Sequence, residues 1–242
     1  MIRDVKPLVV TVFAIAAMSA VGVSEAQAAP GELHIDVGPR ANLYGQPLAG
    51  HTHVLKIGME KVECTGASLE ATVENVQGDQ TQLTTKEVTA TAEYFDCTIG
   101  MTAVQVKMNG CKYTFRGTAA LTAQVQVVGC TDGKAIEVIF PGCTITVGEQ
   151  KELGHVVFTN ESPGLGQGEP METDTKDVIA NATVTGIVYA RDGFLCPQGA
   201  AELSGATTIR AYKDLGAGSQ DIIGDHQFTT LAYGAQVGVF AT

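Results

Sequence analysis

Short runs of alternating apolar and polar residues limit, more than any other feature, how this chain can fold. Because successive side chains of a β-strand point to opposite faces, each run makes a strand with one apolar and one polar face. Turn signals such as Asn109-Gly110 and Asp132-Gly133 separate the runs, and both dipeptides favour tight hairpins. The clearest runs are residues 102–108, 121–128, 135–140 and 144–147. About a dozen such strands, spaced by roughly 8 to 12 residues, predict an all-β fold, either an antiparallel β-sandwich or a barrel-like body.

One segment, residues 162–170, interrupts this rhythm with two prolines and three glycines. Such a sequence does not fit inside a sheet, so it predicts a surface loop or a linker. Strand-like sequence resumes at Asp177. We therefore expect one domain over residues 29–242, with a boundary at residues 161–172 as the alternative.

The N-terminus has the pattern of a secretory signal peptide. Arg3 and Lys6 form a basic start, residues 8–23 are almost wholly apolar, and small residues follow. This pattern predicts a signal peptide over residues 1–28 with cleavage after Ala28, or after Ala29 as the next choice. An uncleaved anchor is the alternative, although the apolar run is short of the roughly 20 residues that cross a bilayer. No later apolar run is long enough to span a membrane, so we expect a soluble, secreted or cell-surface protein.

The charge balance excludes two classes of partner. Removing residues 1–28 of 242 leaves 214, and the net charge of −11 is unchanged because that segment holds two basic and two acidic residues. Nucleic-acid binding depends on Lys and Arg that neutralise phosphates. We therefore do not expect a chain with this negative charge to bind nucleic acid. The same argument excludes docking on anionic lipid.

All six cysteines lie beyond the predicted signal peptide. An even number of cysteines in an exported chain predicts disulfides, and no C-x-x-C pair is present to suggest zinc. The cysteines are Cys64, Cys97, Cys111, Cys130, Cys143 and Cys196.

The pairing of these cysteines is one of fifteen possibilities. A short internal repeat, residues 97–111 and 130–143, favours pairing Cys97 with Cys111 and Cys130 with Cys143, which leaves Cys64 for Cys196. The competing scheme joins Cys97 to Cys130 and Cys111 to Cys143. An extended strand of seven residues spans roughly 23 Å, whereas bridged Cα atoms lie about 4.4–6.8 Å apart, so the local pairs require a short central strand.

Two groups of residues are candidates for metal binding. His51 and His53 would share one face of a strand, as period-two alternation requires; a pair of polar residues on a wet strand face is the alternative. A loop of four carboxylates could offer calcium its oxygen ligands, although it lacks the EF-hand pattern and also fits a solvated acidic loop. These carboxylates are Glu169, Glu172, Asp174 and Asp177. We predict no cofactor.

Several segments resemble a broad group of exported, cysteine-containing β-rich proteins that is abundant in soil actinobacteria. The resemblance covers roughly residues 60–210 and implies export and disulfides. It brings no activity, catalytic residue or cofactor with it. The segments are N-G-C-x-Y-x-F at residues 109–115, G-C-x-I-x-V at 142–147, L-x-x-V-x-F-x-N at 153–160 and G-I-x-Y at 186–189.

No catalytic motif is present. The chain lacks a G-x-S-x-G nucleophile motif, and we interpret Ser219 and His226 as loop residues. The first hypothesis is an exported, non-enzymatic β-protein with a structural or binding role at or outside the cell surface. The alternative is an extracellular hydrolase that acts on a polymer through a carboxylate pair or a Ser-His-Asp site. A pocket that holds such groups would favour the hydrolase.

Overall fold

The computed structural model describes residues 33–35, 40–74, 83–161, 177–214, 233–237 and 239–241. Apart from one short 3-10 helix, η1 (Thr131–Gly133), all regular structure in these residues is β-strand. No helix in the described part of the chain is long and apolar enough to cross a membrane. The predicted signal peptide and most of the predicted boundary at 161–172 lie outside the described residues.

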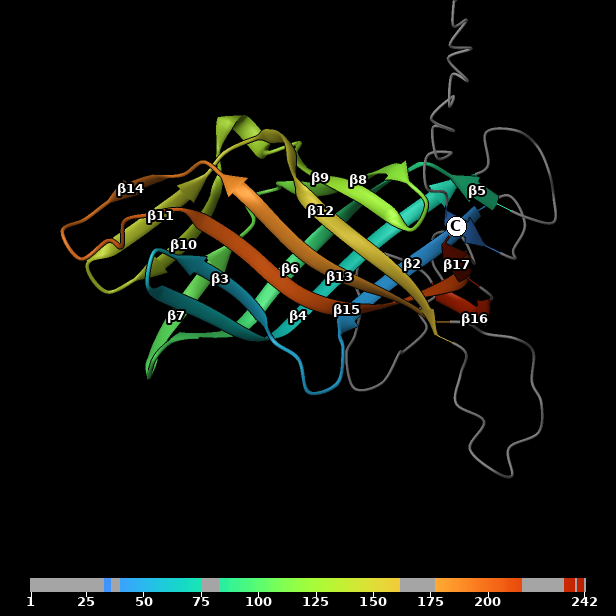
Figure 1. Ribbon diagram of the computed structural model, residues 1–242, viewed down its shortest axis with the longest axis horizontal. Coiled ribbons are helices and arrows are strands. Elements are labelled where there is room, and N and C mark those ends of the chain that lie inside the picture. Colours follow the sequence, from blue (N-terminus) through green and yellow to red (C-terminus); the bar gives the residue numbers. More distant parts are fainter. Residues whose placement is uncertain are drawn as a thin grey trace, which may run out of the picture.

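Eight antiparallel strands form a closed barrel (Figure 1). Each strand pairs with the next barrel strand along the chain, and the last pairs with the first, which closes the ring. The barrel strands, in ring order, are β2 (Arg40–Pro47), β4 (Glu60–Glu74), β6 (Glu87–Ile99), β8 (Lys112–Ala119), β9 (Thr122–Val128), β12 (Gln150–Glu161), β13 (Asp177–Ile187) and β15 (Ala201–Asp214). The predicted all-β, barrel-like fold is confirmed.

The connections between barrel strands differ at the two ends of the barrel. At one end they carry five further strands, which gather at the left of Figure 1. These are β3 (His53–Ile57), β7 (Thr102–Lys107), β10 (Ile136–Phe140), β11 (Cys143–Val147) and β14 (Ala190–Asp192). Because β3 pairs with residues 201–204 of β15 and β2 pairs with residues 207–213, β2 and β3 together fill one strand position.

At the other end, a three-stranded sheet lies next to the start of β6 (Figure 1). It brings together β1 (Leu33–Ile35), β5 (Leu83–Thr85) and β17 (Val239–Ala241), which come from distant parts of the chain. A fourth short strand, β16 (Tyr233–Val237), pairs with β15. We call this the small-sheet end, and the opposite one the disulfide end.

Three disulfides join the six cysteines, and all lie at the disulfide end. The prediction that every cysteine is bridged is therefore confirmed, and such bridges indicate an oxidising environment. Both predicted pairing schemes are wrong. The bonds are Cys64–Cys97, Cys111–Cys130 and Cys143–Cys196.

The reason for these pairings is contact between segments, not similarity of sequence. Cys64 of β4 and Cys97 of β6 are direct cross-strand partners. The turn before Cys111 contacts the segment after Cys130, where the Thr131 amide donates to the Asn109 carbonyl at 3.1 Å. Between Cys97 and Cys111 lies β7, an extended strand and not the short one that a Cys97–Cys111 bond would require.

Along β6 the alternation changes phase once. Val88, Ala90 and Tyr94 face the barrel interior, whereas closer to the disulfide end the inward residue is Cys97. Asp96 lies between these two stretches and has a φ of 51°, a left-handed conformation that Asp tolerates better than most residues. This irregularity turns Cys97 inward, where its sulfur reaches Cys64.

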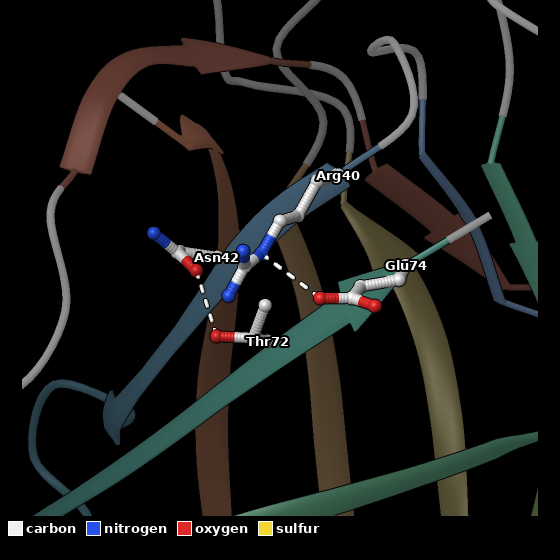
Figure 2. Close-up of polar contacts among 4 residues, drawn as sticks. All are labelled: Arg40, Asn42, Thr72 and Glu74. Atoms are coloured by element: carbon white, nitrogen blue, oxygen red, sulfur yellow. Dashed lines mark hydrogen bonds and ion pairs between the residues drawn. The ribbon is translucent and has the colours of Figure 1, made fainter. Parts of the chain in front are cut away.

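The outer face of the barrel carries polar cross-strand pairs (Figure 2). On neighbouring strands β2 and β4, Arg40 pairs with Glu74 at 3.3 Å, and the Thr72 hydroxyl donates to Asn42 Oδ1 at 2.9 Å. The Arg40–Glu74 pair is well exposed, so it adds little stability. Both pairs match the register in which the alternate residues of β2, such as Leu43, face inward.

Candidate ligand-binding cavity

An apolar cavity of about 180 Å³ lies inside the barrel. Every barrel strand contributes inward-facing side chains to its wall, as period-two alternation requires. Several of these are alanines, including Ala90, Ala123 and Ala180, whose small side chains leave the centre of the barrel unfilled. The wall extends from Ile136 at the disulfide end to Leu33 at the small-sheet end.

His53 is a polar residue in this wall. Its side chain lies at the start of β3 and is 7% exposed, and its Nε2 is 3.1 Å from the Thr207 hydroxyl of β15. Its ring lies 5.8 Å from the ring of Tyr94, at an interplanar angle of 59°. Burial lowers the pKa of His53, and hydrogen bonding to the Ala206 backbone opposes this effect in part. His53 is therefore neutral near pH 7.

We expect acid to destabilise the fold through His53. The pKa of His53 is lower in the folded chain than its ordinary value of about 6.5, so the unfolded chain binds the proton first. The stability that neutral His53 contributes is complete above about pH 6.5 and is lost as the pH falls through the folded pKa. One such group changes the unfolding free energy by at most about 1.4 kcal/mol per pH unit. Urea unfolding of the wild type and of His53→Gln at about pH 7.5 and about pH 5 measures the loss of unfolding free energy on acidification. The variant should lose less unfolding free energy between the two pH values than the wild type does.

A matched control for this prediction is His51→Gln, because His51 is exposed and lies two residues away. That variant should lose as much stability on acidification as the wild type. Equal losses in the wild type and His53→Gln would show that another group is responsible.

Two tyrosines also line the cavity. The hydroxyls of Tyr94 on β6 and Tyr113 on β8 lie close enough to interact, and burial raises the pKa of each. Both are therefore neutral hydroxyls near pH 7. They are the only described tyrosines in the cavity wall.

The predicted histidine site does not form. His51 lies in the turn before β3 and is exposed, whereas His53 is a buried residue of β3 bonded to Thr207, so the two do not share one face of a strand. The described residues contain no group of three or more His, Cys, Asp or Glu that could hold a metal.

Of the four predicted calcium ligands, only Asp177 lies in the described part of the chain. Its carboxylate accepts hydrogen bonds from Arg210 at 3.0 Å, on the outer face of β13 and β15. Asp177 is thus engaged in an ion pair there. Glu169, Glu172 and Asp174 lie outside the described residues.

The described residues of the cavity wall do not complete a hydrolase site. The cavity wall contains Ser204 and His53, yet no Asp or Glu is among its described residues. Neither a carboxylate pair nor a Ser-His-Asp site is completed there. Ser219 and His226 lie outside the described residues.

Sequence reasoning missed the cavity and its two tyrosines, and it identified His53 only as a candidate metal ligand. Alternation predicts which side chains share a face, but it does not say whether the sheet closes on itself. The available signal was the small inward residue in strands such as β13, where Ala180 and Ala182 take positions that a filled core would give to larger side chains.

Comparisons with protein-family models, with curated proteins and with solved structures found no match.

Proposed function

We propose that this chain is an exported binding protein that holds a small, largely apolar molecule inside its barrel. The observation that supports it is the cavity of about 180 Å³ with an almost wholly apolar wall. A protein cavity of about 150 Å³ with similar walls stays dry and binds benzene. Eight-stranded barrels are also wide enough to hold one small ligand. The space here suits one ring with a short substituent.

Action outside the cell is part of the same proposal. The signal-like residues 1–28, the resemblance to exported actinobacterial proteins and the three disulfides support it. The disulfides brace the end of the barrel that carries the long connections. A rigid wall favours binding, because less freedom is lost when the ligand enters.

Binding of α-methylstyrene or acetophenone tests the proposal, because each is a benzene ring with a short substituent. At a concentration ten times its dissociation constant, a bound probe should raise the unfolding free energy by about 1.4 kcal/mol. Ala180→Leu should weaken binding at least tenfold, because the added side chain enters the cavity. Calorimetric titration and urea unfolding measure the two effects.

Asn181→Leu is the matched control, since it adds the same side chain on the opposite, exposed face of β13. It should bind the probes as the wild type does. The proposal is wrong if neither probe binds the wild type, or if Ala180→Leu folds and binds both probes with unchanged affinity.

A further inference from the structure

The Tyr94 and Tyr113 hydroxyls are hydrogen-bond donors in a wall that is otherwise mostly apolar. Tyr113 is 9% exposed and lines the cavity from β8, and Tyr94 lines it from the neighbouring strand β6. Both hydroxyls keep their protons near pH 7, because burial raises the pKa of each. The cavity therefore has two neutral O–H groups side by side.

The two hydroxyls cannot satisfy each other completely. A phenolic hydroxyl has one proton to donate, so the pair has two protons, and a bond between the oxygens uses only one of them. Among the described residues, no group other than Tyr94 interacts with the Tyr113 hydroxyl. The nearby His53 directs its Nε2 to Thr207 instead. At least one tyrosine proton thus has no acceptor among the described residues.

A buried donor without an acceptor is unfavourable, and a ligand oxygen that accepts its proton removes that penalty. A hydrocarbon of the same shape cannot do so. A carboxylate would lose its hydration in the apolar wall, where the one described cationic side chain, that of Lys86, lies at the small-sheet end and is exposed. These two arguments select against hydrocarbons and anions.

We infer that the ligand of this cavity is a neutral, mostly apolar molecule whose one acceptor oxygen, such as a carbonyl, receives a hydrogen bond from the Tyr94–Tyr113 pair. This inference rests on the proposed function and adds the chemical class of the ligand. It also orients the ligand, with its oxygen against β6 and β8 and its apolar part against the alanines of β9 and β13.

Acetophenone and α-methylstyrene form a matched pair of probes, because they differ only by a carbonyl oxygen in place of a methylene group. The measured quantity is the dissociation constant of α-methylstyrene divided by that of acetophenone. Replacing both hydroxyls in Tyr94→Phe/Tyr113→Phe should lower this ratio by about three- to tenfold, the typical effect of one neutral hydrogen bond. Comparing this ratio between the wild type and the variant cancels the difference in how well water solvates the two probes.

Tyr189→Phe is the control, because its hydroxyl lies outside the cavity and donates to the Gly199 carbonyl at 2.9 Å. It should leave the ratio unchanged. A double variant with the wild-type ratio overturns the inference while the proposed function stands. If neither probe binds the wild type, both fail.

An infrared measurement on the wild type keeps the test valid if the double variant does not fold. The carbonyl stretch of bound acetophenone should lie at a lower frequency than in hexane, because accepting a hydrogen bond weakens the C=O bond. A hexane-like frequency for the bound probe contradicts the inference.

Discussion

Replacing both cysteines of the Cys143–Cys196 bridge by alanine should lower the unfolding free energy by roughly 4 kcal/mol, the largest effect expected from any of the three disulfides. The reason is loop length. This bond closes 53 residues of sequence, against 33 for Cys64–Cys97 and 19 for Cys111–Cys130. Longer loops lose more freedom in the unfolded chain when they are closed.

The three closed loops follow one another along the chain without overlap, so each bridge restricts its own segment independently. Removing Cys111–Cys130 in the same way should therefore remove only about 3 kcal/mol. Urea unfolding of both double variants, with the remaining cysteines oxidised, measures the difference. Equal losses, or a larger loss from Cys111–Cys130, would contradict the loop-length argument.

Gly154→Ala should destabilise the protein by about 3 kcal/mol or more, at the upper end of the range for overpacking. Gly154 lies in β12, where it faces the backbone of β13. A Cβ at this position would lie less than 3.0 Å from the Thr183 carbonyl oxygen, the Val184 Cα and the Thr185 amide nitrogen. Backbone atoms in a paired strand cannot move aside cheaply, so the ladder between β12 and β13 must shift.

The matched control is Gly148→Ala, six residues earlier, where an added Cβ meets nothing within 4 Å. Its backbone does not require glycine, so the change should be within about 1 kcal/mol and could stabilise the fold by restricting the unfolded chain. Thermal and urea unfolding of the two variants should differ clearly. Similar stabilities would show that β12 and β13 are not so close at Gly154.

Much of the local structure could be predicted from the sequence, because strands and turns depend on neighbouring residues. The runs at 102–108 and 144–147 correspond to β7 (Thr102–Lys107) and β11 (Cys143–Val147). The Asn109-Gly110 turn has positive φ at both residues, as its sequence predicts. Fold class followed from these features alone.

The disulfide pairing and the cavity could not be predicted, because both depend on which strands become neighbours. The partner of Cys97 is set by the ladder between β4 and β6, and Asp96 adds a change of phase that no alternation pattern reveals. The pair of hydroxyls needed the same information, since Tyr94 and Tyr113 meet only when β6 and β8 lie side by side.

The pattern of sulfur links also bears on how the protein is made. Every cysteine is bonded to its nearest unpaired neighbour in chain order, first to second, third to fourth and fifth to sixth. If the chain is exported N-terminus first, as the proposed function implies, an oxidant that joins each newly arrived thiol to the free thiol before it produces the native set directly. Maturation then requires no enzyme to reshuffle wrong bonds.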